Sequence, residues 1–228
     1  MRGLRFDPEA FVTDCRAAAD EADGPAAVRA VVEAAIRDGS SIDAALGRDL
    51  GEPDTLFSSD WLTVLRIRWP RGIRSWPHEH RMWAVIGVYA GHEQNRLYER
   101  SPDGLAERAA RTVAERDVLT LDADAIHSVE TAHLSVGLHV YGGDILNVER
   151  SAWGPDGREG SYRDESAAFR AMFLTIRELA AERSEPLDDE ARYKAITALQ
   201  AACDRQRRHL THAESRRVVA EAWNLERD

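Results

Sequence analysis

The strongest constraint on the fold of this chain comes from a short run, residues 72–91. Within it stands His78-Glu79-His80, and an apolar, β-rich segment follows at residues 82–89. Alternate side chains of an extended strand point to the same face, so His78 and His80 project together and Glu79 projects the other way. Two imidazoles converging from one strand provide half of a metal site. The alternative is that the two histidines are only polar surface residues at the edge of a strand. The remaining sequence is needed to distinguish these two interpretations.

Composition excludes several classes of function. The chain has 228 residues, 43% of them hydrophobic, which is enough for one substantial core or for a core with a helical appendage. Its formal net charge of −10 argues against nucleic acid as a partner, because phosphate binding requires a basic surface. The only lysine, Lys194, lies far from the histidine motif, so Schiff-base chemistry is excluded.

The chain also lacks the signals of export and of disulfide bonding. No apolar run approaches the length that spans a bilayer, and the first residues lack a secretory apolar stretch, so we expect a cytoplasmic protein without membrane contact. Cys15 and Cys203 form neither a disulfide framework nor a metal knuckle. We expect both thiols to be buried as small hydrophobes.

The first 50 residues are predicted to form a helical cap. Asp7 and Pro8 predict the start of a helix over 7–21, and the apolar spacing of residues 25–38 predicts a second helix that ends at Gly39. A short third helix follows Ser41, and residues 51–54 form a loop. This cap, 1–50, carries no recognisable chemistry.

Residues 51–150 have the pattern of a β-barrel or sandwich. Short β-rich segments alternate with turn signals such as Ser101-Pro-Asp-Gly104, which is typical of antiparallel sheets and not of βαβ units. The predicted strands are 61–68, 82–89, 93–98, 117–121, 126–130 and 134–141.

Residues 151–228 are predicted to be a C-terminal helical extension. Apolar residues recur there at helical spacing in three segments. Such stripes pack on a core or on a neighbouring subunit, and we expect that a homo-oligomer, if one forms, uses this helical tail.

The third ligand of a metal site should come from another strand of the barrel. His127 lies in a short apolar strand directly after a turn, where such a ligand is expected. Farther along, the two-residue period places His139 and Tyr141 on one face of the last strand. These residues are the candidates for a metal centre and for the groups around it.

The pattern can be compared with known families. Gly72, His78-x-His80 and Gly91 resemble the first cupin box, with Ala84 where most cupins have a glutamate ligand, and the His127 region stands in place of the second. Within cupins, Gly137-Leu-His139-Val-Tyr141 resembles the Ser-His-Tyr strand of the cysteine dioxygenase-like thiol dioxygenases. The resemblance covers about residues 55–145. The regions around Trp83 and residues 139–144 are closer still to an uncharacterised bacterial branch of predicted metal-dependent cupins.

The resemblance implies a mainly β fold, the small barrel or double-stranded β-helix of cupins, with helices at both ends. It also implies a function, a mononuclear non-haem Fe(II) dioxygenase that oxidises a small thiol to its sulfinic acid. Carried over, the iron ligands are His78, His80 and His127. Three neutral ligands leave the iron its full charge, which attracts a thiolate. Dioxygen binds beside it, and His139 orients the Tyr141 hydroxyl toward the reacting groups.

Departures from this family bear on the substrate. Gly137 replaces the serine of the Ser-His-Tyr strand, and Ala84 and Val85 leave no cysteine to cross-link with Tyr141. The arginine that binds a substrate carboxylate in the family has no counterpart at residues 54–57, so the substrate need not be cysteine. The candidates for lining the substrate pocket are Trp83, Arg66 and Arg68, with Arg74, Arg81 and Arg96 as further candidate arginines.

The residue types alone do not select iron. Three imidazoles suit zinc, copper, nickel and iron. A different Fe(II) oxygenase, a hydrolase that uses metal-bound hydroxide, and a cupin that binds metal or a small ligand without turnover therefore stay open as alternatives.

Overall fold

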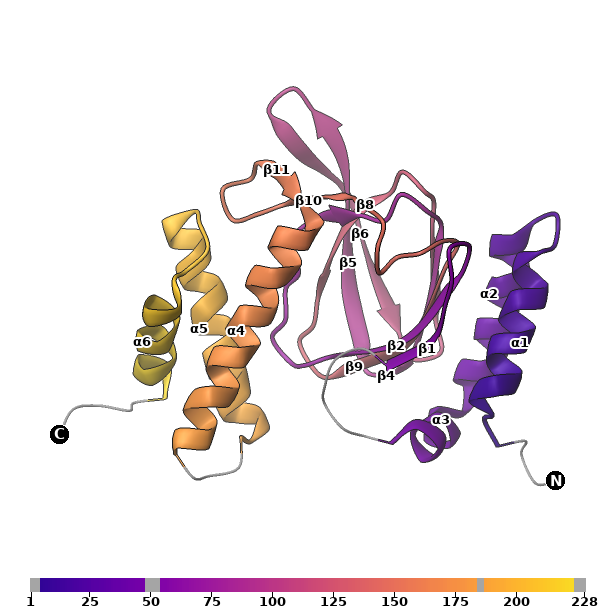
Figure 1. Cartoon of the computed structure of the whole chain (residues 1–228), viewed down its shortest axis with the longest axis horizontal. Coiled ribbons are helices and arrows are strands. Elements are labelled where there is room, and N and C mark those ends of the chain that lie inside the picture. Colours follow the sequence, from indigo (N-terminus) through magenta and orange to yellow (C-terminus); the bar gives the residue numbers. More distant parts are fainter. Residues whose placement is uncertain (1–4, 48–53, 184–186, 224–228) are drawn as a thin grey trace.

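Two antiparallel sheets stand between two groups of helices (Figure 1). The computed structural model describes residues 5–47, 54–183 and 187–223, and the elements given below lie within these ranges. Of the predicted loop at 51–54, residues 51–53 fall outside these ranges, and Asp54 is not in a loop but begins strand β1. In Figure 1 the N-terminal helices lie on one side of the sheets and the C-terminal helices on the other.

The first sheet has the strand order β1-β2-β9-β4-β7, and the second has the order β11-β10-β3-β8-β5-β6. Strands that are distant in sequence are neighbours in both sheets, as β2, β9 and β4 are. The bounds of the strands are β1 Asp54–Ser58, β2 Thr63–Trp69, β3 His78–Glu79, β4 Ala84–Ala90, β5 His92–Ser101, β6 Gly104–Ala114, β7 Val118–Leu121, β8 Ile126–Glu130, β9 Ser135–Tyr141, β10 Ser151–Trp153 and β11 Glu159–Ser161.

This arrangement is the double-stranded β-helix of cupins, as the resemblance implied. Its interior is an apolar cluster to which both sheets contribute, with Leu65 and Ile86 from the first sheet and Val113 from the second. The strand predicted at 82–89 is observed as β4, and its residues 84–89 are all buried, because the barrel interior covers one face of β4 and helices cover the other.

The N-terminal helices cover the outer face of the first sheet. They are α1 (Pro8–Ala19), α2 (Gly24–Ala35), a 3₁₀ turn (Ile36–Asp38) and α3 (Gly39–Leu46). The Asp7 side chain caps α1 as predicted. We expected Gly39 to end the second helix. It is instead the first residue of α3. A Cβ at Gly39 would lie 2.7 Å from the Tyr89 side chain, so the glycine permits close packing on β4.

The C-terminal helices form a bundle of their own: α4 (Tyr162–Glu182), α5 (Asp189–Gln206) and α6 (His212–Ala222). The bundle core includes Met172, Ile176 and Leu199, and it also takes in Ile73 from the connection between β2 and β3. The bundle and the barrel therefore share buried apolar surface.

Four strands escaped the sequence analysis, namely β1, β6, β10 and β11. β1 lies at the edge of the first sheet, where it pairs with β2. β6 pairs with β5 along its whole length, but most of its side chains are exposed, so it shows no apolar alternation. β10 and β11 lie beyond residue 150, where we predicted the helical extension to begin, yet they belong to the second sheet. They are short, and each is defined by its partner strand rather than by its own composition.

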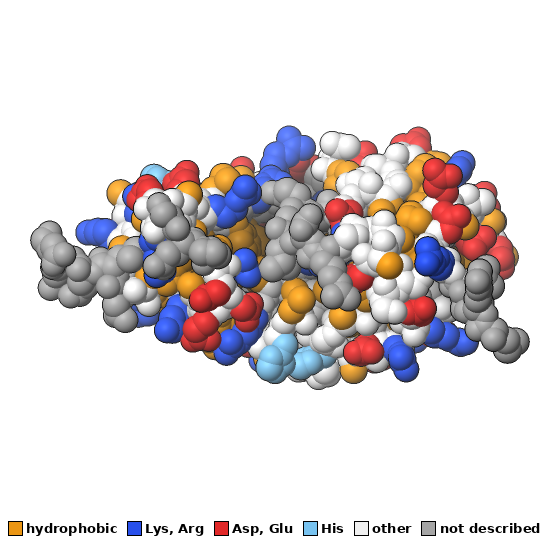
Figure 2. Space-filling view, turned by 90° about the horizontal axis from the view of Figure 1, so that it is seen from below, with side chains coloured by type: hydrophobic (Ala, Val, Ile, Leu, Met, Phe, Trp, Pro, Cys, Tyr) orange, Lys and Arg blue, Asp and Glu red, His pale blue; other side chains and the backbone are white. Residues whose placement is uncertain are grey.

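The surface shows no dominant charge on the face seen from below. Figure 2 shows acidic and basic side chains interspersed with apolar ones there, among the residues that are coloured by type. Of the helices described, none combines the length and the apolar character needed to cross a membrane.

Candidate metal centre

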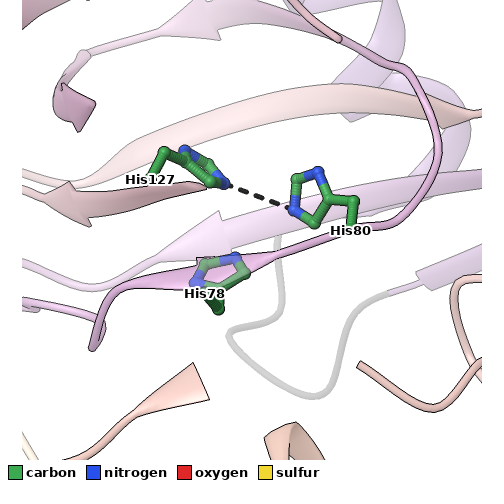
Figure 3. A group of neighbouring side chains, drawn as sticks. All are labelled: His78, His80 and His127. Carbon is green, nitrogen blue, oxygen red and sulfur yellow. Dashed lines mark hydrogen bonds between the residues drawn. The ribbon is translucent and has the colours of Figure 1, made fainter. Parts of the chain in front are cut away.

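Three histidines meet between the two sheets (Figure 3). His78 on β3 is the register partner of His127 on β8, and His80 follows directly after β3. One ring nitrogen from each of the three lies within 4.8 Å of the other two. The three side chains are 8%, 4% and 2% exposed for His78, His80 and His127, respectively. The structure therefore brings together the three residues that the sequence analysis named as ligands.

Hydrogen bonds orient two of the imidazoles. His78 Nδ1 lies 3.0 Å from the backbone carbonyl of Trp76, and His127 Nδ1 lies 2.9 Å from Asn95 Oδ1. Because both oxygens only accept, each Nδ1 carries the hydrogen and each Nε2 keeps its lone pair. The Nε2 atoms of His127 and His80 stand 3.3 Å apart, as the dashed line in Figure 3 shows.

Burial keeps these imidazoles neutral. It lowers the pKa of His78 to about 4, with Arg150 as a further cause. The pKa values of His80 and His127 fall well below the usual range, first through burial and then through repulsion by neighbouring histidines. Neutral imidazole is the form that binds a metal, so the trio is available as a ligand set at neutral pH.

The donor set fits a divalent transition metal. Three nitrogen donors converge, and no carboxylate of the described residues joins the group. His80 Nδ1 is buried and has no hydrogen-bond partner among the described residues, so the ring is held by packing and not by a competing polar contact. His78, His80 and His127 would hold the ion, and three protein ligands are fewer than such an ion usually takes, so it could bind further ligands.

His139 and Tyr141 lie beside the trio, on the inward face of β9. The Tyr141 hydroxyl is 3.2 Å from His139 Nδ1, and the Tyr141 ring meets the His80 ring edge-on, with ring centres 5.1 Å apart. Burial raises the pKa of Tyr141 above its usual range and lowers the pKa of His139 to about 3. Tyr141 therefore keeps its proton, and His139 stays neutral beside it.

Gly137 explains how His139 is accommodated. A Cβ at this position would lie only 3.0 Å from His139 Nε2, so the missing side chain leaves room for the imidazole. That nitrogen is buried and has no partner among the described residues. The imidazole thus occupies the space beside Gly137, and it is held through its contact with Tyr141.

Two residues of the site were missed from the sequence. The Arg150 guanidinium stacks 3.6 Å from the ring centre of Tyr162, which in turn lies 5.3 Å from the His78 ring. Arg150 is 7% exposed, donates to the Ile145 carbonyl, and has no partner for its Nε among the described residues. Its positive charge lowers the pKa of His78 and of His80. Both residues lie past the last predicted strand, in a segment without a periodic pattern.

Arg66 and Arg68 do not line this site, which corrects our expectation. Both project from the face of β2 opposite to the barrel interior. Arg66 is 2% exposed and binds Asp54 and the carbonyls of residues 46 and 47. Arg68 binds Asp43 and the Gly47 carbonyl. These arginines anchor the helical cap to the first sheet.

Trp83 also packs away from the histidines. Its side chain joins the apolar cluster beneath the N-terminal helices, and its indole lies against Gly142, where a Cβ would come within 2.1 Å of the ring. The expected pocket role of Trp83 is replaced by packing between the sheet and the cap.

The other arginines considered from the sequence are engaged elsewhere. Arg74 pairs with Asp204 in the helical bundle, and Arg96 pairs with Glu107 and Glu130 on the second sheet. Arg81 binds Glu79, which also accepts from Arg100 and from the backbone N–H of Ser151. Glu79 thus projects away from the trio, as the strand period predicted.

Comparison with known proteins adds likenesses of fold. No protein-family model matches the chain. An uncharacterised protein with a double-stranded β-helix domain from Klebsiella pneumoniae is 12% identical over 49% of this chain and 87% of its own, with a TM-score of 0.38. A cupin family protein from Methanocaldococcus jannaschii is 11% identical over 45% of this chain and 91% of its own, with a TM-score of 0.37. The DMSP lyase DddQ from Ruegeria pomeroyi is 22% identical over 51% of this chain and 66% of its own, with a TM-score of 0.36.

Proposed function

We propose that this protein is a mononuclear non-haem Fe(II) dioxygenase that oxidises a small anionic thiol to its sulfinic acid. The observation that carries the proposal is the neutral ligand set, three buried imidazoles without a carboxylate, beside a tyrosine hydroxyl. Bound to the trio, iron would bring a thiolate and dioxygen together so that both oxygen atoms pass to sulfur. The remaining steps of binding and orientation fall to the protein side chains.

The charges around the trio favour a substrate with two negative charges. A divalent ion would be surrounded by neutral imidazoles, with the Arg150 guanidinium on one side. The buried acid on the inward face of the barrel is Glu93. The metal dication and the Arg150 guanidinium would therefore be opposed, among the described residues, by the Glu93 carboxylate. A substrate with a thiolate and a second anionic group would neutralise the remaining positive charge in this low-dielectric interior.

Arg150 and Tyr162 are suited to hold that second anionic group. A guanidinium binds a carboxylate through paired N–H donors, and stacking on the Tyr162 ring fixes its plane. Tyr162 lies beside His78, so a substrate held there would present its sulfur toward the trio. This supplies, from a different part of the chain, the arginine that residues 54–57 lack.

Tyr141 and His139 are suited to act on the proton and on the developing charge. The Tyr141 hydroxyl keeps its proton and can donate a hydrogen bond to an oxygen or sulfur beside His80. When the hydroxyl donates in that direction, His139 Nδ1–H can donate to the Tyr141 oxygen across the 3.2 Å contact and so orient the hydroxyl. The three ligand histidines, His139 and Tyr141 are all buried, which limits water near the reacting groups.

The deciding experiment measures metal content after purification without added metal, followed by oxygen uptake with cysteine, cysteamine and 3-mercaptopropionate. We expect stoichiometric iron, and faster uptake with the carboxylated thiols than with cysteamine, which lacks an anionic group. Equal rates with cysteamine would refute the role of Arg150. Iron-loaded protein without uptake on any thiol would refute the thiol dioxygenase and leave a different oxygenase, a metal-hydroxide hydrolase or a binding protein.

A further inference from the structure

Glu93 is a buried acid without a cationic partner. It lies on β5 and is 0% exposed, and among the described residues its side chain accepts two long hydrogen bonds, from Asn95 Nδ2 at 3.4 Å and from Ser135 Oγ at 3.5 Å. No arginine, lysine or histidine of the described residues pairs with it. Burial raises its pKa to about 7. Such a costly group is rarely placed in an interior without a use.

Glu79, the other acid that is almost fully buried among the described residues, provides the contrast. It is 7% exposed, faces away from the trio, and is neutralised by Arg81 and Arg100. Glu93 instead shares its strand face with Asn95, whose amide reaches His127. The unneutralised carboxylate is therefore the one that points toward the metal centre.

The contacts form a directed chain from Glu93 to the trio. An ionised carboxylate only accepts hydrogen bonds, so it fixes the Asn95 amide with its nitrogen toward Glu93. The Asn95 oxygen then faces His127 Nδ1 and accepts its hydrogen at 2.9 Å. That hydrogen bond leaves the His127 Nε2 lone pair directed toward His80. Among the described residues, Glu93 is the hydrogen-bond partner that fixes the nitrogen end of the Asn95 amide, and its charge therefore selects this orientation.

We infer that Glu93 is a positioning residue that, through Asn95, selects the metal-binding tautomer of His127 and supplies the counter-charge for the bound dication. The inference rests on the proposed metal site but not on the reaction with thiol and oxygen. Glu93, which would not bind the metal itself, thereby supplies the negative charge that a carboxylate ligand would otherwise bring. Loss of such an outer partner typically weakens metal binding about 10- to 100-fold.

The test compares the affinity of metal-free protein for Co(II), measured by competition with a chelator and followed by the visible spectrum of the bound ion. We expect Glu93→Gln to weaken Co(II) binding about 10- to 100-fold. Asp43→Asn is the matched control, because it removes the same charge from the far side of the first sheet, where Asp43 contacts Arg66 and Arg68. Its Co(II) affinity should equal that of the wild type. Unchanged affinity in Glu93→Gln would overturn the inference.

A second variant separates positioning from mere structural support. In the double variant Glu93→Gln/Asn95→Asp, the negative charge moves one step closer and accepts directly from His127 Nδ1. We expect Co(II) affinity to recover to at least the wild-type value. Thermal unfolding of the metal-free variants verifies that each one folds. A folded double variant that binds no better than Glu93→Gln would overturn the inference. Neither result depends on thiol oxidation, so failure of the proposed function is recognised separately.

Discussion

Each imidazole of the trio is useful because burial makes it a poor base. A histidine with a lowered pKa does not compete for protons at neutral pH, and its lone pair is available without a protonation cost. The same burial makes the metal-free site unfavourable, since His80 Nδ1 and His139 Nε2 lack partners among the described residues. Metal binding should therefore stabilise the folded protein.

Replacement of His80 by alanine tests the ligand assignment. We expect His80→Ala to lose stoichiometric iron and the metal-induced rise in melting temperature. The metal-free variant should fold, because the substitution also removes a buried nitrogen without a partner. Metal analysis and thermal unfolding with and without Fe(II) provide the measurement. His133→Ala, at an exposed position, is the control and should behave as wild type. Full iron content in His80→Ala would remove this residue from the site.

Replacement of Tyr141 by phenylalanine tests the hydroxyl. Tyr141→Phe keeps the ring beside His80 but removes the group that contacts His139. We expect kcat for thiol oxidation to fall about 100-fold, as is usual when a positioned acid–base group is lost. The iron content should be unchanged, because the hydroxyl is not one of the three donors. An unchanged rate would exclude Tyr141 from the reaction.

The charge on Glu93 should make the stability of the metal-free protein depend on pH. Its pKa is raised by burial from 4.5 to about 7, so the folded state holds this proton more tightly than the unfolded state. The contribution of Glu93 to the free energy of unfolding should therefore fall as the pH rises from about 4.5 to about 7, whereas the buried histidines, whose pKa values are lowered, contribute in the opposite direction. The loss is on the order of 3 kcal/mol. Urea titrations at pH 5 and pH 8 should show that stability rises more with pH in Glu93→Gln than in the wild type, by about this amount. Equal pH dependence in both would contradict it.

Strand parity was sufficient to predict the shared direction of His78 and His80 and the opposite direction of Glu79. It could not place Arg150 or Tyr162, because their approach to His78 depends on where β10 and α4 fold back over the sheet. Arg66 shows the converse error. The alternation of side chains along β2 places Arg66 on one of the two faces of the strand. Which of these faces is the outer one depends on where the helical cap packs, and this was not predictable from the alternation.

At the scale of elements, apolar patterning predicted the helices and strands that bury a periodic set of side chains, and it failed for a strand whose side chains are mostly exposed. The strand predicted at 82–89 was found as β4 because its sequence is a continuous apolar run, and the bundle helices were found because their apolar residues recur at helical spacing. β6 was missed because its partner is β5 and its side chains are mostly exposed. Hydrogen bonding to a neighbour, and not composition, makes it a strand.

The turn between β4 and β5 depends on Gly91. Its φ is 73°, and a Cβ would lie 2.0 Å from the backbone carbonyl oxygen of Leu134, which cannot move without disturbing β9. We expect Gly91→Ala to lower the free energy of unfolding by more than about 2 kcal/mol. Gly157→Ala is the control, with a φ of 75° and open space around the position. It should cost only the backbone strain, about 1 kcal/mol. Equal losses in urea titrations of the two variants would refute the steric cause.

At the scale of the whole molecule, the two helical groups have different relations to the site. The N-terminal cap packs on the outer face of the first sheet, away from the histidines. The C-terminal bundle contacts the connection between β2 and β3, through Tyr193 against Gly72 and through Gln200, which donates to the Arg74 carbonyl. That connection leads directly into His78. The bundle is thus a support of the metal centre and not an independent appendage.

Ile73 is the residue through which this support can be tested. Its side chain is 1% exposed, it belongs to the bundle core, and it stands in the same connection as Trp76, whose carbonyl orients His78. We expect Ile73→Ala to cost about 2–5 kcal/mol of stability. Hydrogen exchange should become faster in α4, α5 and α6, and Co(II) affinity should fall.

Ile42→Ala provides the comparison, because Ile42 is 0% exposed in the core of the N-terminal cap. A similar loss of stability is expected there, since the same side chain is truncated in an equally buried place. Faster exchange should be confined to the cap, and Co(II) affinity should match the wild type. If both variants weaken Co(II) binding equally, the effect is one of global stability, and the bundle does not specifically support His78. If only Ile73→Ala does so, the support runs through the connection that precedes the ligand.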